Sequence, residues 1–110
     1  MILAAMGKGG GGGALYPDFV GRRALFVGNG TGPANSTAAD PVSLALPNYY
    51  IDAILGGAST DGTYYVVGVP NGVGPRATWS LYYYATSNSA KQTGNLTTET
   101  FVVSAIVGQF

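Results

Sequence analysis

The chain has 110 residues, which is the length of one domain. Only 9% of them are charged, against about 25% in an average soluble domain, and the net charge is zero, so little repulsion keeps copies apart. The sequence holds no cysteine and no histidine, which excludes disulfides, thiol chemistry and the residue that most often serves as general base or metal ligand.

The first fifteen residues, MILAAMGKGGGGGAL, are of low complexity and contain an unbroken glycine run from Gly9 to Gly13. Because glycine loses the most backbone freedom on ordering, we expect residues 1–15 to form a flexible arm ahead of a single β domain over residues 16–110. Two alternatives stay open. The arm lies along a neighbouring subunit, or Met6 is the true start and the first five residues are incidental.

Two short strands are predicted before the middle of the chain. Residues 24–27, ALFV, form an apolar run that ends in a Gly-Asn-Gly turn, which favours a strand. Residues 28–41 are rich in Gly, Pro, Asn, Ser and Thr and are predicted to form a loop. Residues 42–46 alternate with the period of a strand, which Pro47 ends or places at a sheet edge.

The stretch 49–85 contains the only tryptophan and most of the tyrosines, and it predicts a three-stranded antiparallel meander. Its strands are expected at residues 49–55, 63–69 and 78–85. Gly56-Gly57 and Asp61-Gly62 mark the connection between the first two, since Asp-Gly is a strong hairpin signal. In the third strand, Trp79 and Leu81 are expected to face the core.

The faces of the first two strands carry further expectations. In the first strand, one face is predicted to carry Tyr49, Ile51, Ala53 and Leu55. Neither face of residues 63–69 is polar, so we expect a second layer or another subunit to cover this strand on both sides.

Residues 99–107 predict the last strand, with Phe101, Val103, Ala105 and Val107 on one face. No segment combines the period, length and caps of a helix. Six strand candidates separated by Gly- and Pro-rich turns predict an all-β fold, a small antiparallel sandwich or barrel of about six strands.

No residues have the spacing of a catalytic, cofactor-binding or metal site, so we expect no enzyme, no cofactor and no metal. The glycine-rich segments near Lys8 and Asn29 lack the helix and the Gly-Lys-Ser/Thr pattern of a phosphate loop. Asp61 is the expected turn residue beside Gly62. Asp52, in an apolar strand, either pairs with Arg76 across the sheet or lies on a wet face, and a hydrolase built on Asp52 would lack a base.

Charge and hydropathy also limit the partners. The basic residues are scattered and form no stripe that could neutralise phosphates, so no nucleic acid is expected. No window approaches the ~20 apolar residues of a membrane span, so no membrane is expected. A small, neutral, aromatic-rich domain is poorly equipped to stay monomeric, and we expect a homo-oligomer.

Tyrosines occur in adjacent groups, at 49–50, 64–65 and 82–84. Neighbouring residues of a strand point to opposite faces, so one set packs inward while another faces out. Subunit interfaces are rich in Tyr and poor in charge, and few charged or amide groups lie nearby to hold a sugar. We therefore favour a subunit interface over a sugar-stacking platform for the outward set, Tyr50, Tyr65, Tyr82 and Tyr84.

Four segments carry a resemblance: ALFVGNGTGP at 24–33, YYIDAILGGAS at 49–59, GTYYVVGVP at 62–70 and GVGPRATWSLYYYA at 72–85. With them, the last four-fifths of the chain resembles the small virion proteins of tailed bacteriophages, and it is most similar to those that decorate or cement capsids. The resemblance is one of style (short, cysteine-free, uncharged, rich in Gly, Thr and Tyr). It matches no specific motif, and no site residues carry over.

The resemblance implies a non-enzymatic β domain that is made in the host cytoplasm and bound in many copies to the capsid surface. Such domains are often trimers, and they stabilise the shell through contacts with the major capsid protein or other virion proteins. Two alternatives remain: a tail or fibre component of the virion, and a carbohydrate- or surface-binding β module.

Overall fold

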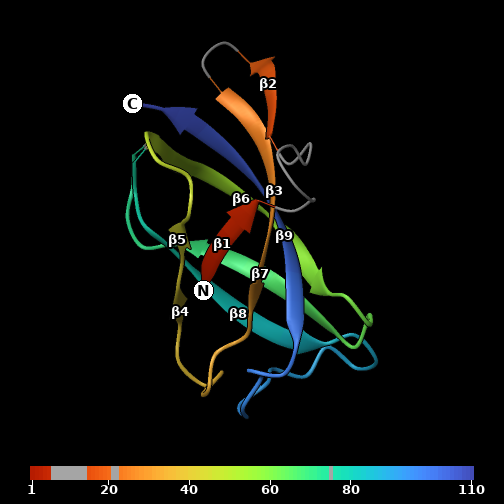
Figure 1. Ribbon diagram of the computed structural model, residues 1–110. Helices are drawn as coiled ribbons and strands as arrows, with labels where there is room; N and C mark the ends of the chain where they lie inside the picture. The colour runs from red at the N-terminus through yellow and green to blue at the C-terminus, as the bar shows by residue number, and fades with distance from the viewer. Residues whose placement is uncertain (6–14, 21–22, 75) are drawn as a thin grey trace.

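The structure is a computed structural model that describes residues 1–5, 15–20, 23–74 and 76–110. These residues are arranged in strands and contain no helix (Figure 1), hence none long and apolar enough to cross a membrane. The strands are β1 (Ile2–Ala5), β2 (Leu15–Val20), β3 (Arg23–Thr31), β4 (Asp40–Pro41), β5 (Ser43–Leu44), β6 (Tyr49–Ser59), β7 (Tyr64–Pro70), β8 (Trp79–Ala85) and β9 (Thr100–Gln109).

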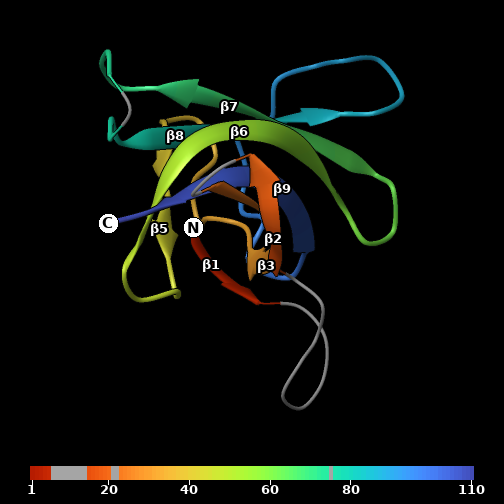
Figure 2. The same cartoon turned by 90° about the horizontal axis from the view of Figure 1, so that it is seen from above.

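All strands belong to one mixed sheet, which curls into a nearly closed barrel (Figure 2). Its order is β4-β8-β7-β6-β9-β3-β1-β5, and β2 pairs with β3 beside β1. The two outermost strands, β4 and β5, are consecutive in the chain, with Val42 alone between them. The N–H of Val42 donates to the carbonyl of Trp79 in β8, and the N–H of Ser43 donates to the carbonyl of Met1. One short segment therefore links both edges of the sheet.

The predicted all-β class and the meander are confirmed, because β6, β7 and β8 are sheet neighbours in chain order. The predicted count of six strands is not confirmed. Residues 40–44 form two short strands instead of one, and two further strands precede β3. The expected flexible arm over residues 1–15 is not confirmed either. Ile2–Ala5 pairs with β3 and β5 as strand β1, and residues 6–14 lie outside the described residues.

The interior of the barrel is filled by alternate residues of its strands. In β9 the four side chains that were predicted to share a face, Phe101, Val103, Ala105 and Val107, are all fully buried. Strand β8 contributes the expected Leu81, also fully buried, while Trp79 is half-buried against this core. Because the side-chain period of a strand is two, the same alternation leaves the opposite faces of β8 and β9 outside the barrel.

Strand β6 departs from the prediction because it contains two irregularities. Its register against β9 shifts between Ile51 and Ala53 and again between Ile54 and Gly56. Each extra residue moves the following side chains to the other face, so Ile51 and Ile54 are buried while Leu55 is 60% exposed. The predicted common face of Tyr49, Ile51, Ala53 and Leu55 is therefore wrong. Gly56-Gly57 lies inside β6 instead of in the connection.

The hairpin after β6 turns at Asp61-Gly62, as predicted. Gly62 has φ of 78°, a conformation that glycine adopts without steric cost. The Asp61 carboxylate accepts hydrogen bonds from the N–H of Thr63 at 3.0 Å and the hydroxyl of Ser59 at 2.7 Å. These two donors, the N–H first, lower the pKa of Asp61 to about 2.

Near the barrel edges, Asp40 at the start of β4 joins two other elements. Its carboxylate accepts a hydrogen bond from the hydroxyl of Tyr83 in β8 at 2.5 Å and forms an ion pair with the amino group of Met1 at 2.9 Å. Burial, and then the bond to Asp40, raise the pKa of Tyr83 far above its ordinary value, so the phenol stays a neutral donor.

We expect Tyr83→Phe to lower the free energy of unfolding by about 1.5–3 kcal/mol, the usual contribution of a hydrogen bond to a charged group. The phenylalanine ring keeps the packing of the tyrosine ring, so the loss of unfolding free energy measures the contribution of the hydroxyl alone. Tyr84→Phe is the matched control, because the Tyr84 hydroxyl makes no hydrogen bond within the described residues, and urea titration should show it close to the parent. Equal midpoints for both variants would contradict a stabilising role for the Tyr83–Asp40 bond.

Candidate assembly surface

The outer side of β7 and β8 carries three of the four tyrosines that were predicted to face outward. The strands are antiparallel, with Tyr65 opposite Tyr84 and Val67 opposite Tyr82. Tyr83, between Tyr82 and Tyr84, is fully buried, so the alternation of the strand turns its two neighbours outward. We name this surface the tyrosine face and define it by Tyr65, Val67, Val69, Tyr82 and Tyr84.

The rings of the tyrosine face are held in place by neighbours. Tyr65 and Tyr84 stack across the strands with ring centroids 5.4 Å apart and planes 17° apart. The ammonium of Lys91 lies 4.9 Å from the centroid of the Tyr82 ring and donates to the carbonyl of Thr37 at 3.0 Å. Such cross-strand aromatic pairs and cation–π contacts each contribute about 0.5–1 kcal/mol. The tyrosine face is thus a pre-ordered surface.

Two valines of β7 are exposed to solvent on this surface. Val67 is 39% exposed and Val69 is 40% exposed, whereas Val66, on the opposite side of the strand, is buried. The expectation that β7 is covered on both sides therefore holds for its inner side, while in the single chain the outer side is uncovered. Val67 and Val69 would gain from burial by a further molecule.

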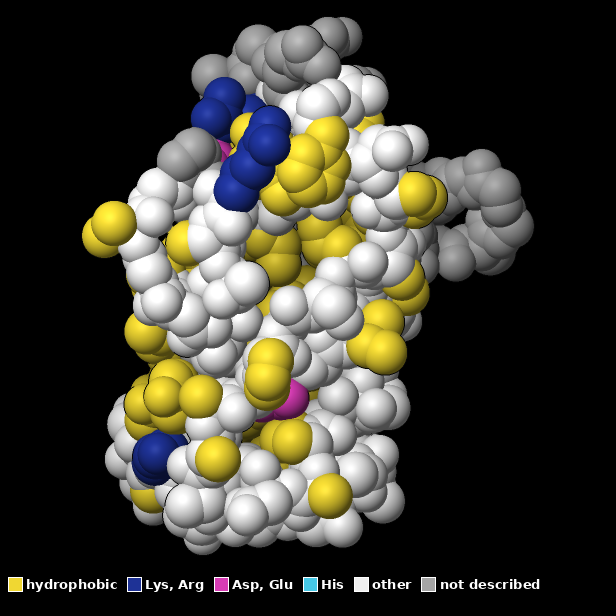
Figure 3. Space-filling model, turned by 90° about the vertical axis from the view of Figure 1, so that its left-hand side faces the viewer, with side chains coloured by type: hydrophobic (Ala, Val, Ile, Leu, Met, Phe, Trp, Pro, Cys, Tyr) yellow, Lys and Arg dark blue, Asp and Glu magenta, His cyan; other side chains and the backbone are white. Residues whose placement is uncertain are grey.

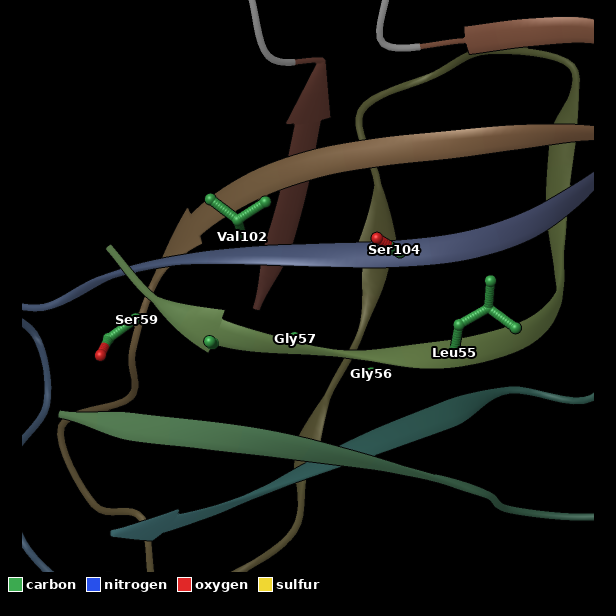
Figure 4. A pocket seen from close by; sticks show the side chains of 7 residues that line it. Leu55, Gly56, Gly57, Ser59, Val102 and Ser104 are labelled. Carbon is green, nitrogen blue, oxygen red and sulfur yellow. The ribbon is translucent and has the colours of Figure 1, made fainter. Parts of the chain in front are cut away.

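Beside the tyrosine face, an open groove of about 600 Å³ runs along the outer side of β6 and β9 (Figure 4). Leu55, Gly56 and Ala58 of β6 and Val102 and Ser104 of β9 line it. No charged residue of the described part of the chain contributes to its lining. The glycine leaves part of the groove without a side chain, so another backbone could approach closely there.

The groove and the tyrosine face form one continuous surface. Ala58 pairs with Tyr65 on one side of β6 and with Val102 on the other, and Tyr65 pairs with Tyr84. This outward row crosses the four strands β8, β7, β6 and β9. The residues of this row are uncharged, and Lys91 over the Tyr82 ring brings one charge beside it. A surface so poor in charge is typical of contact regions between proteins.

Tyr50, the fourth predicted tyrosine, does not join the tyrosine face. It pairs with Gly108, six residues along β9 from Val102, which is about 20 Å at the rise of a strand. Its ring lies 5.2 Å from that of Phe110, and the guanidinium of Arg76 lies 5.0 Å from the Tyr50 ring and 4.7 Å from the Phe110 ring.

The proposed pairing of Asp52 with Arg76 is wrong. Asp52 binds Arg23 of β3, with 2.6 Å between Nε and the carboxylate, and the hydrogen bond and charge of Asp52 raise the pKa of Arg23. The register of the sheet explains why Asp52 pairs with Arg23. Strands β3 and β6 both pair with β9, which brings these two residues to the same end of the sheet. The side chain of Arg76 reaches the aromatic rings instead.

Sequence reasoning missed Leu55, Val67 and Val69 as surface residues. The signal for Leu55 was present, since glycines inside a strand pattern mark bulges. The sequence contains no signal that the two valines are exposed, because the pattern of a strand that is apolar on both faces does not indicate which face is covered. Within residues 1–5, 15–20, 23–74 and 76–110, no three acidic side chains gather as metal ligands.

Comparisons with known proteins assign no role to this surface. A scan against protein-family models, a search of curated proteins and a search of solved structures each found no match for this chain. The surface is therefore interpreted from its own chemistry.

Proposed function

We propose that this chain is a non-enzymatic structural protein that assembles through the tyrosine face and the adjoining groove. The observation that carries the proposal is the uncharged outer row from Tyr84 through Tyr65 and Ala58 to Val102, with exposed Val67 beside it. Interface cores are depleted of charge and enriched in tyrosine, and this surface has both properties. A homo-oligomer is the expected assembly, with a trimer as one form.

The chemistry of such an assembly is apolar and main-chain contact. A standard interface buries about 1,600 Å² in total, and pre-ordered rings lose little conformational entropy when a partner docks on them. The contact of one copy can be weak, because an assembly that binds several sites at once multiplies weak contacts into strong overall attachment.

The proposed partner beyond the chain itself is a phage shell, contacted through the major capsid protein or other virion proteins. Support for this finer proposal comes from the resemblance to capsid decoration proteins together with the small neutral barrel. A location elsewhere in the virion, in the tail or a fibre, is the alternative. A gene neighbourhood that includes a major capsid protein is the expected finding, and a neighbourhood without virion genes would speak against it.

The assembly is tested by light scattering of the purified chain over a range of concentrations. We expect a defined oligomer, and we expect Val67→Lys to raise the dissociation constant at least about tenfold, because each copy would bury a further positive charge in the contact, beside Lys91. Val73→Lys is the matched control. Val73 is also exposed, at 101%, but lies in the loop between β7 and β8, away from the tyrosine face.

A parent chain that stays monomeric at every concentration would contradict the proposal. So would a Val67→Lys variant that assembles like the parent. A monomer that binds glycans on an array, and loses that binding with Tyr82→Ala or Tyr84→Ala, would favour the carbohydrate-binding alternative, in which the tyrosine rings stack on sugars.

A further inference from the structure

A second hollow lies at one mouth of the barrel, away from the tyrosine face. One part of it is formed by inward-facing residues where β6 and β8 begin, Tyr49, Ile51 and Trp79. The other part is formed by Val42 and Leu44, in the short segment that links the two edges of the sheet. Figure 3 faces this side and shows a hollow with hydrophobic side chains at its floor and dark-blue basic side chains above it. The mouth of a β-barrel is a common place for a ligand site.

The size and the walls of this hollow restrict what can enter. Its volume is about 200 Å³, below the roughly 300–1,000 Å³ of pockets for drug-sized ligands, so it suits a single ring. Three aromatic residues, Tyr49, Tyr50 and Trp79, contribute to the lining. Aromatic rings favour a flat guest, and the two phenols add hydroxyl groups that can donate or accept hydrogen bonds.

Among the residues that the structure describes, Arg76 is the only charged one that lines the hollow. Its guanidinium is held by the rings of Tyr50 and Phe110, at 5.0 and 4.7 Å from their centroids. Neither ion pair of the described residues includes it, since these join Met1 to Asp40 and Arg23 to Asp52. A guanidinium fixed by ring contacts keeps its donors for an anion, and its planar fork matches a carboxylate.

We propose that the barrel mouth is a binding site for a single ring that carries a carboxylate. The ring would lie among Tyr49, Tyr50 and Trp79, and the carboxylate would receive the guanidinium of Arg76. A uronic acid and an aromatic acid share this chemistry. The site does not depend on assembly, because its charge and its tryptophan lie outside the tyrosine face.

Trp79 is the only tryptophan of the chain, so its fluorescence reports binding directly. Sodium glucuronate and sodium benzoate are titrated at constant ionic strength, with glucose and benzyl alcohol as uncharged counterparts. We expect at least one carboxylate to give a saturable change with a dissociation constant on the order of 1 mM, as fits a ligand of this size. The response to glucuronate or to benzoate then distinguishes a sugar ring from an aromatic ring.

Variants assign the binding to Arg76. Arg76→Gln should weaken binding at least about tenfold, and Arg76→Lys, which keeps the charge without the fork, should lie in between. Lys91→Gln is the control, since Lys91 also lies over a tyrosine ring but at Tyr82, outside the hollow. Thermal melts verify that each variant is folded.

Three results would overturn the proposal: no saturable response to either carboxylate, equal binding of the uncharged counterparts, or unchanged affinity in Arg76→Gln. Assembly is measured separately by light scattering with Val67→Lys. The failure of this site and the failure of the assembly proposal are therefore distinguishable.

Discussion

Leu3→Ala is expected to lower the free energy of unfolding by about 2–5 kcal/mol, which is the range for removing a fully buried leucine side chain. Leu3 is 0% exposed and belongs to the hydrophobic core, although it lies within the first five residues. It sits in β1, which pairs with β3 on one side and with β5 on the other. A domain of this kind is stable by only about 5–15 kcal/mol, so the loss is a large fraction of the total.

The matched control is Ile2→Ala in the same strand. Ile2 is 67% exposed, so its truncation should change the unfolding free energy by less than about 0.5 kcal/mol. Guanidinium titration of both variants measures the difference. Equal stabilities would contradict a core role for Leu3 and would revive the hypothesis of a flexible arm.

Much of the central sheet was predictable from local pattern. Along residues 101–107 of β9, inward and outward side chains alternate without interruption, and each of the four inward positions is fully buried. The Asp61-Gly62 turn fixes the hairpin between β6 and β7, because its backbone geometry needs a residue such as glycine at φ of 78°. Patterns of this kind depend only on neighbours in sequence.

Barrel closure was not predictable, because it depends on pairings between distant parts of the chain. The segment MILAAM has no alternation that marks a strand, yet β1 is held by Gly28 and Asn29 of β3 and by Ser43 and Leu44 of β5. A strand of four residues has little local preference of its own, and its partners supply the stability.

For the candidate surface, alternation placed Tyr65, Tyr82 and Tyr84 together, since all three lie in regular strands that pair without a shift. Tyr50 does not join them because it lies near the start of β6, opposite Gly108 and about 20 Å along β9 from Val102, with both register shifts of β6 in between. Asp52 lies at the first of the two register shifts in β6, between Ile51 and Ala53, and it pairs with Arg23.

Gly57→Ala should destabilise the barrel by about 3 kcal/mol, at the upper end of the cost of overpacking. A Cβ at Gly57 would lie 2.3 Å from the carbonyl oxygen of Val102 and 3.0 Å from the Cα of Val103. Both are backbone atoms of β9, which is the central partner of β6 and cannot move without disturbing its pairing with β3 as well. The close approach of two backbones thus explains a glycine inside this strand.

Gly72→Ala provides the control, because a Cβ there meets no atom within 4 Å. The stability of that variant should be unchanged or raised by less than about 1 kcal/mol, since alanine restricts the unfolded chain. Thermal melts of the two variants separate steric crowding from the general effect of replacing glycine. If Gly57→Ala melted like Gly72→Ala, β6 and β9 would have to be further apart than described. The groove that they line with Leu55 and Ser104 would then have a different floor, so this comparison also tests the shape of the proposed assembly surface.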